Sequence, residues 1–157
     1  MQLVNQPSVE PEAQSQIFGK DRLRVGVVGY SAQAFNQETA LLLLQEVFDL
    51  FEHVPNVEVI SGLTQLGVPA LAYEEAVKRG WRTVGVACAQ AFEYKCFPVD
   101  EVVIVGANWG DESSTFLSMV DVLVRIGGGR QSHQEVDMAR VQGKYVMEFE
   151  LPASLSP

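Results

Sequence analysis

The sequence predicts an α/β fold with a doubly wound, mostly parallel sheet of about six strands and helices on both faces. Short apolar runs alternate with longer segments of helical pattern along most of the chain, which is the order of a parallel β-α array. Most of the apolar runs are continuous rather than alternating with polar residues. Continuous apolarity indicates strands that are covered on both faces.

The first half of the chain alternates strand and helix signals. "RLRVGVVGY" (22–30) is an apolar run that closes on a glycine and predicts the first strand. "QETALLLLQEVFDLFEHV" (37–54) has the length and charged interruptions of a helix. "NVEVISG" (56–62) predicts the next strand, "PALAYEEAVKRG" (69–80) a helix that a glycine stops, and "TVGVACAQ" (83–90) a third strand.

The second half of the chain continues the same alternation. "EVVIVGA" (101–107) predicts a fourth strand and "DESSTFLSMV" (111–120) a helix. "DVLVRIGGG" (121–129) predicts a strand that runs into three glycines, and "SHQEVDMARVQG" (132–143) a helix ending on a glycine. "KYVMEFEL" (144–151) predicts the last strand.

Length and composition indicate one globular domain. The chain has 157 residues, of which 47% are hydrophobic and 20% charged. We expect residues 21–157 to form a single domain, because this length is too short for two ordinary domains. Residues 1–20 are rich in Pro, Gln, Ser and Glu, and we expect them to form a flexible N-terminal tail.

Charge and hydropathy exclude several kinds of partner. The formal net charge is −9 and no run of Lys or Arg interrupts it, so we expect no nucleic acid partner. No apolar run is long enough for a membrane span, and we expect no membrane partner. Two cysteines and no export signal indicate the cytoplasm and free thiols.

Glycines stand at the ends of several predicted strands, and these ends meet at one edge of the sheet. Gly29, Gly62, Gly106 and the run 127–129 each follow an apolar run. Ligands of open parallel sheets bind at the carboxyl ends of the strands, so this edge is the candidate site. Glycine also serves tight turns, which is the simpler interpretation for Gly106 alone. For three consecutive glycines we favour close approach of a ligand to the backbone.

The glycines do not form a known phosphate loop. "GVVGYSAQ" and "GGGRQS" lack the G-x-G-x-x-G pattern of dinucleotide sites. Gly62 and Gly67 have the glycine spacing of a P-loop, but Val68 and Pro69 stand where Lys and Ser or Thr are required. Gly62 and Gly67 are kept as candidate ligand contacts without an NTPase assignment.

Ser132 and Glu135 have two interpretations. "SHQE" has the S-x-x-E form of a capping box, in which the two side chains satisfy backbone N–H groups at a helix start. Alternatively, Ser132 binds a phosphate at the start of the helix and Glu135 faces the ligand. The sequence leaves these two roles for Glu135 open.

The segment "GGGRQSHQE" (127–135) resembles the P-G-G-x-G-T-x-x-E motif of the LONELY GUY-type proteins, often labelled lysine decarboxylases, and of the related molybdenum cofactor carrier proteins. "VGVVGYSA", "VISGLTQLGVPALAYEEA" and "VDVLVRI" are also similar to segments of this family. The resemblance covers essentially residues 23–150. By position, Gly128 and Gly129 match the paired glycines, Ser132 the threonine and Glu135 the glutamate.

The resemblance implies a Rossmann-like fold, often in a homo-oligomer, that holds a nucleotide or similar phosphorylated ligand over the glycines. In the enzymes of the family it implies hydrolysis of the N-glycosidic bond of a nucleoside 5′-monophosphate. Such cleavage builds positive charge on the sugar, which the carboxylate of Glu135 would stabilise as catalytic residue. The helix N-terminus near Ser132 would hold the phosphate.

The chain departs from the family motif at three positions. Gly127 replaces the proline and Gln131 replaces the third glycine. The family arginine falls near Glu112, so an acid stands where the enzymes carry a cation. These departures favour a carrier or sensor-like binding protein over a phosphoribohydrolase, which is the alternative function.

Four further residues are candidate ligand contacts, each with an ordinary alternative. Arg130 could supply a substitute positive charge, or be solvated. Trp109 could stack on a base, or pack against a neighbouring subunit. Tyr30 and Ser31 follow the first strand and could contact the ligand, or serve the turn alone. The expected ligand and phosphate contacts, besides Glu135, are therefore Gly29, Tyr30, Ser31, Gly62, Gly67, Trp109, Gly127, Gly128, Gly129, Arg130, Gln131 and Ser132.

No metal site and no required cofactor are predicted, although a nucleotide or phosphate could be bound. Cys88, Cys96 and the two histidines lack the spacing of metal ligands. Lysine decarboxylation needs a Schiff-base lysine for pyridoxal phosphate, and no lysine lies at a glycine-rich strand end. We expect a small phosphorylated ligand and a homo-oligomer, a dimer or higher.

Overall fold

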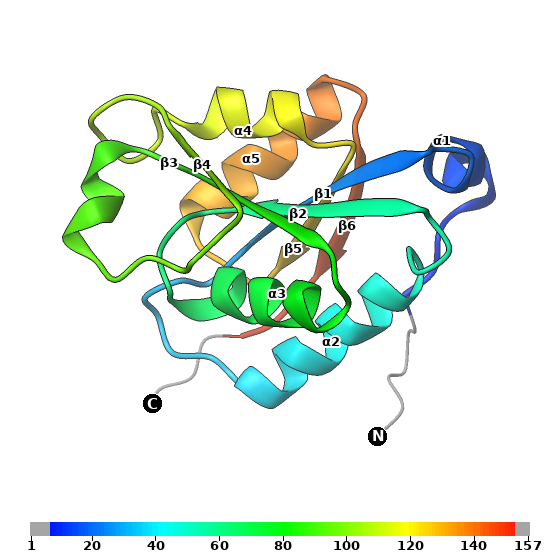
Figure 1. Ribbon diagram of the computed structural model, residues 1–157, viewed down its shortest axis with the longest axis horizontal. Coiled ribbons are helices and arrows are strands. Elements are labelled where there is room, and N and C mark those ends of the chain that lie inside the picture. Colours follow the sequence, from blue (N-terminus) through cyan, green and yellow to red (C-terminus); the bar gives the residue numbers. More distant parts are fainter. Residues whose placement is uncertain (1–6, 153–157) are drawn as a thin grey trace.

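The structure, a computed structural model, describes residues 7–152 (Figure 1). Its centre is a six-stranded sheet in the order β4-β3-β2-β1-β5-β6, in which every neighbouring pair is parallel. The strands are β1 (Arg22–Gly29), β2 (Asn56–Ser61), β3 (Arg82–Ala87), β4 (Glu101–Ile104), β5 (Val122–Ile126) and β6 (Tyr145–Phe149). The predicted α/β fold class is confirmed.

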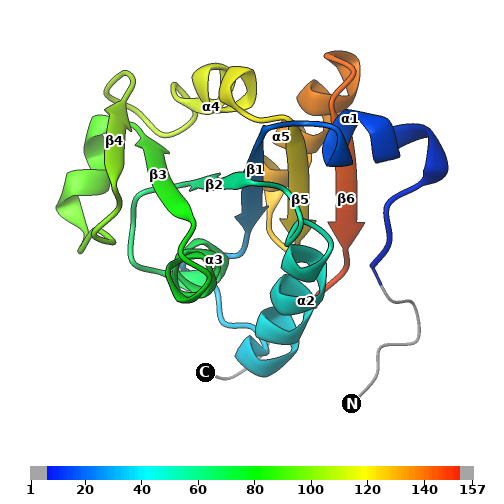
Figure 2. The ribbon, with the colours of Figure 1, turned by 45° about the vertical axis from the view of Figure 1, so that its right-hand side comes forward.

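Helices cover both faces of this sheet (Figures 1 and 2). α2 (Gln37–Asp49) and α3 (Gly67–Lys78) lie together on one face, and α4 (Ser113–Met119) and α5 (Arg130–Val141) lie on the other. Two hydrophobic clusters fill the space between sheet and helices. Along β1 the side chains alternate, so that Val25 and Val27 pack toward α2 and α3 while Val28 packs toward α4 and α5.

The N-terminal segment differs from the expected flexible tail over residues 1–20. Residues Pro11–Ala13 form a 3₁₀ turn (η1) that continues into α1 (Gln14–Phe18). Val9, Ala13 and Ile17 are buried in the larger hydrophobic cluster. Their apolar spacing places one side of this short segment against the core. Residues 1–6 of the expected tail lie outside the described residues.

Several element boundaries also differ from the sequence-based expectation: the helix expected over 37–54 ends at Asp49 and the strand expected over 101–107 ends at Ile104. Two further differences lie beside the candidate site. The strand expected over 83–90 ends at Ala87, and the 3₁₀ turn η2 (Ala89–Glu93) follows, with buried Cys88 between them. The helix expected from Ser132 begins at Arg130, with Gly129 as its N-cap. This earlier start places Ser132 and Glu135 inside the helix rather than at its cap.

The chain order creates a crevice beside β1. β1 lies between β2 and β5 in the sheet. The helices that follow β1 and β5, which are α2 and α5, lie on opposite faces of the sheet. Such a switch point separates the loops that follow the two strands and opens a crevice at their carboxyl ends. The register pairs Gly29 with Ile126, which brings the end of β1 directly beside the glycines at 127–129.

Candidate ligand-binding site

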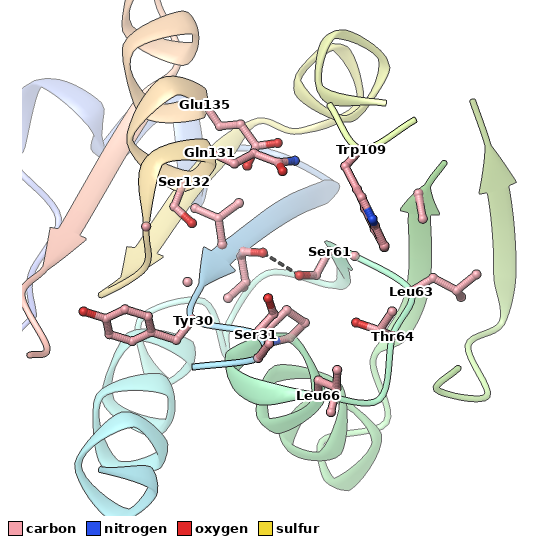
Figure 3. A pocket seen from close by; sticks show the side chains of 18 of the residues that line it. Tyr30, Ser31, Ser61, Leu63, Thr64, Leu66, Trp109, Gln131, Ser132 and Glu135 are labelled. Atoms are coloured by element: carbon pink, nitrogen blue, oxygen red, sulfur yellow. Dashed lines mark hydrogen bonds between the residues drawn. The ribbon is translucent and has the colours of Figure 1, made fainter. Parts of the chain in front are cut away.

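A cavity of about 500 Å³ opens at this crevice. Its walls come from the ends of β1, β2 and β3, the loop before α4 and the first two turns of α5 (Figure 3). The volume lies within the range of small-molecule sites. The lining residues are Val27, Val28, Gly29, Tyr30, Ser31, Ala32, Gln33, Ser61, Gly62, Leu63, Thr64, Leu66, Pro69, Val86, Ala87, Tyr94, Trp109, Glu112, Phe116, Gly129, Arg130, Gln131, Ser132 and Glu135.

The glycine run makes a turn that other residues would not adopt. Gly127 has φ +60° and Gly128 has φ +101°, where side chains are strained. A Cβ at Gly128 would also lie 2.6 Å from the Ser132 Oγ. Proline fixes φ near −65°, so the family proline would not fit the conformation that Gly127 has here. Glycine in place of the family proline at position 127 therefore allows a backbone conformation that proline would not.

The end of this turn presents free backbone donors to the cavity. Within residues 7–152, the N–H groups from Gly129 to Ser132 donate to no protein acceptor, as is usual for the first turn of a helix. A Cβ built on Gly129 would meet nothing within 4 Å, so this backbone faces open space. Free N–H groups and the positive end of the helix dipole together favour an anion at this position.

A buried arginine fixes the turn from behind. Arg125 on β5 has a side chain only 2% exposed and donates through Nη1 to the Gly127 carbonyl at 2.8 Å. The same guanidinium pairs with Glu148 at 2.8 Å and with Glu150. The Gly127 N–H donates to the Phe149 carbonyl. The glycine turn is thus tied to the end of β6 and the residues just beyond it.

The floor of the cavity is formed by the ends of β1 and β2. Ser61 is buried, and its hydroxyl donates to the Val27 carbonyl at 2.5 Å (Figure 3). The Tyr73 hydroxyl on α3 lies 2.8 Å from the Gly62 carbonyl and 2.9 Å from the Val84 carbonyl. These contacts hold the strand ends together below the open edge.

A pair of acidic side chains lines the opposite end of the cavity. Glu135 is 6% exposed and Glu112 is 5% exposed. The Ser113 hydroxyl donates to Glu135 Oε2 at 3.0 Å. The pKa of Glu135 is raised to about 7: burial and the negative charge of Glu112 raise it, and the hydrogen bonds from Ser113 and Gln131 oppose the rise. Glu135 therefore carries a proton in a large share of molecules at neutral pH.

Glu112 is held by one strong and one long hydrogen bond. Its Oε1 accepts from the Gly110 N–H at 2.7 Å and from Gln131 Nε2 at 3.4 Å. Its Oε2 is buried and has no hydrogen-bond partner in the described structure. We call Glu112, Glu135 and Gln131 the acid end of the cavity.

Trp109 stands at the mouth of the acid end, in the loop before α4. It is 47% exposed, and Figure 3 shows its ring extending toward the cavity. Asp111 Oδ2 accepts from the N–H groups of Ala107 and Asn108, and the Trp109 N–H donates to Gln90. These hydrogen bonds hold the backbone of the loop, and the Trp109 ring lies tilted against the Tyr94 ring with their centroids 6.2 Å apart.

Most of the residues predicted from the sequence line this one cavity. They are Gly29, Tyr30, Ser31, Gly62, Trp109, Gly129, Arg130, Gln131, Ser132 and Glu135.

Gly67, Gly127 and Gly128, which were predicted to contact the ligand, shape the loops instead of lining the cavity. Gly67 has φ +61°, and a Cβ there would lie 2.1 Å from the Tyr30 carbonyl oxygen. A Cβ at Gly127 would collide with the Tyr30 ring. The glycines at 67 and 127 thus make room for the turn that carries Tyr30.

The capping-box interpretation of Ser132 and Glu135 is wrong. α5 begins at Arg130 and has no side-chain cap, and Glu135 accepts from Ser113 on another helix. Glu135 therefore faces the cavity, as the second interpretation required.

Sequence reasoning missed several lining residues. The polar or aromatic ones are Gln33, Ser61, Thr64, Tyr94, Glu112 and Phe116. Ser61 carried a signal, because a hydroxyl at the end of an apolar strand one residue before Gly62 lies at the predicted edge. Tyr94 lies in a segment whose path the sequence did not indicate. Among residues 7–152 no group of three or more His, Cys, Asp or Glu is placed to hold a metal ion, and no helix there is long and apolar enough to cross a membrane.

Together, the fold and the cavity define a Rossmann-like α/β protein with a cavity at the switch point of its sheet. No family model and no curated protein matches the chain. Solved structures do match it. The molybdenum cofactor carrier protein of Chlamydomonas reinhardtii is 26% identical, with a TM-score of 0.65 over 82% of this chain and 76% of that one.

Two further structures extend the comparison. The molybdenum cofactor binding protein of the phototrophic bacterium Rippkaea orientalis is 22% identical, with a TM-score of 0.67 over 81% of this chain and 76% of that one. TM1055, a structural genomics target, is 25% identical, with a TM-score of 0.62 over 79% and 72%. The chain has the fold of the molybdenum cofactor carrier proteins, and the resemblance found in "GGGRQSHQE" is supported.

Proposed function

We propose that the protein binds a small phosphorylated ligand in the cavity and holds it without cleaving it, as a carrier or sensor does. The observation that carries this proposal is the start of α5. There the N–H groups from Gly129 to Ser132 have no acceptor within the described residues, and all four residues line the cavity of about 500 Å³. The phosphate lies against these donors, and the Ser132 and Ser31 side chains are within the same lining.

The fold comparison supports binding of a small ligand. The two named neighbours are described as molybdenum cofactor carrier or binding proteins. We carry over to this chain only the class of role, a protein that holds a phosphorylated small molecule. A nucleotide and a phosphorylated pterin both belong to that class.

The acid end argues against hydrolysis of a nucleoside monophosphate. In the enzymes that the motif resembles, an arginine grips the substrate where this chain has Glu112. A buried acid at that position cannot supply this cation, and it favours the protonated, uncharged form of Glu135. A protonated Glu135 cannot stabilise positive charge on a sugar. Hydrolysis with Glu135 as the catalytic carboxylate remains the second candidate, because this side chain does line the cavity.

The two functions are separated by one experiment. AMP is titrated into the protein in a calorimeter, and the recovered nucleotide is then analysed by chromatography after a long incubation. Binding with intact AMP supports the carrier. Release of adenine that Glu135→Gln abolishes would establish the hydrolase instead. Lysine decarboxylation is not proposed, because no lysine is among the residues described as lining the cavity.

A homo-oligomer and a cytoplasmic location complete the proposal. The resemblance implies an oligomer of two or more subunits, and light scattering across a dilution series measures it. A mass equal to one chain at all concentrations would exclude the oligomer.

A further inference from the structure

The acid end lies further along α5 than the anion position. Glu135 is five residues beyond Arg130 on α5, which corresponds to about 7.5 Å along the helix axis. The phosphate of a mononucleotide and the near edge of its base are separated by a comparable length. A ligand whose phosphate lies at the start of α5 therefore extends its other end toward Glu112 and Glu135.

Glu112 Oε2 lacks the partner that a buried carboxylate oxygen requires. Glu112 is only 5% exposed, and its Oε1 already accepts the Gly110 and Gln131 donors. Oε2 has no donor within the described part of the chain and is closed off from solvent, so a ligand donor meets it once the carboxyl group turns toward the cavity that Glu112 lines. An unpaired buried acceptor costs about 1–3 kcal/mol, more when it is charged, so a donor from a ligand would remove a real penalty here.

The neighbouring groups restrict the shape and chemistry of that donor. Trp109 presents a flat aromatic surface at the mouth of the acid end (Figure 3), and such surfaces favour planar rings. Glu112 when ionised accepts hydrogen bonds and donates none. An acceptor atom of the ligand facing this carboxylate would therefore be repelled.

We propose, on the basis of the proposed function, that Glu112 selects a planar nitrogen heterocycle that presents N–H donors along one edge. The ring of this heterocycle lies beside Trp109. The guanine edge meets this requirement, because its N1–H and 2-amino groups are adjacent donors. Hypoxanthine retains N1–H and lacks the amino group. Adenine presents the N1 acceptor beside its amino group and fits less well.

Substitution of Glu112 by glutamine tests this assignment closely. The amide oxygen can still accept from the Gly110 N–H, while the amide nitrogen replaces the unpartnered oxygen and turns an acceptor into a donor. Glu93→Gln is the matched control, since Glu93 is exposed and does not line the cavity. Both variants remove one negative charge.

The experiment is calorimetric titration of the wild-type protein and both variants with GMP, IMP, AMP and ribose 5-phosphate. We expect the wild-type protein to bind GMP at least about tenfold more tightly than AMP, with IMP between them. Glu112→Gln should lose this order, and Glu93→Gln should keep it. If circular dichroism shows that Glu112→Gln does not fold, the order of the wild-type protein's affinities for GMP, IMP and AMP is the deciding result.

Equal affinities of the wild-type protein for GMP and AMP, or an unchanged order in folded Glu112→Gln, would overturn the assignment of Glu112. Binding of ribose 5-phosphate in that case leaves the proposed function in place. Absence of binding by all four compounds, ribose 5-phosphate included, would overturn the proposed function and the assignment with it.

Discussion

Replacing Glu135 with glutamine should change how the stability of the protein depends on pH. The pKa of Glu135 is about 7 in the folded protein against 4.5 for an ordinary glutamate. Between these values the folded state binds more protons than the unfolded chain. Stability from this group is therefore fully present below pH 4.5 and is lost as the pH rises through about 7.

The magnitude follows from the width of that pH interval. One pH unit of difference in pKa corresponds to about 1.4 kcal/mol, so the interval from 4.5 to about 7 amounts to about 3 kcal/mol. Glutamine does not ionise, and its amide oxygen can still accept from Ser113. Glu135→Gln should match the wild-type protein at about pH 4.5 and exceed its free energy of unfolding by up to about 3 kcal/mol at about pH 8.

Urea unfolding followed by circular dichroism between about pH 4.5 and pH 8 measures this effect. Glu93→Gln, which alters an exposed glutamate, should run parallel to the wild-type protein over the whole range. A parallel course for Glu135→Gln as well would refute the reasoning, since it would show that Glu135 ionises in the folded protein as easily as in the unfolded chain.

Three further predictions test the frame of the site. Arg125→Met should lower the free energy of unfolding, measured in urea, by about 3 kcal/mol, because it leaves buried acceptors without their cation. Glu150→Gln changes a side chain that is 82% exposed and should cost less than about 1 kcal/mol. Equal losses for the two variants would contradict this role of Arg125. Gly128→Ala should lower the free energy of unfolding by about 2 kcal/mol and weaken phosphate binding, because Gly128 has φ +101° and an added Cβ would meet Ser132. Thermal melting measures the first effect and titration the second. Unchanged values would refute the account of the turn. Ser61→Ala should cost about 1 kcal/mol in the same urea assay, and a stabilised variant would show that its hydrogen bond contributes nothing.

The sequence was sufficient for the sheet, because its signals were local. Continuous apolar runs ending on glycines marked the strands and the edge at which Gly29 and Gly129 meet. The order of the strands depends on how distant segments pair, and local patterns do not carry that information. β4 in particular is short and largely exposed, although "EVVIVGA" has the apolar pattern of a buried strand.

The acid end could not be predicted from local patterns, because its contacts join residues far apart in the chain. Ser113 and Glu135 are 22 residues apart, and the nearer pairing of Ser132 with Glu135 was equally consistent with the sequence until the helix start was known. Arg125 gave an unused signal. An arginine within the apolar run "VLVRI" requires an acidic partner, and the parallel register places Glu148 beside it.

The central claim, that a phosphate binds the backbone at the start of α5, is tested most directly by nuclear magnetic resonance. Ribose 5-phosphate is titrated into ¹⁵N-labelled protein, and the amide resonances are followed residue by residue. The account predicts that the largest shifts fall on the amides from Gly129 to Ser132, which have no acceptor in the described structure. Saturable shifts confined to another part of the protein, with these amides unmoved, would contradict it.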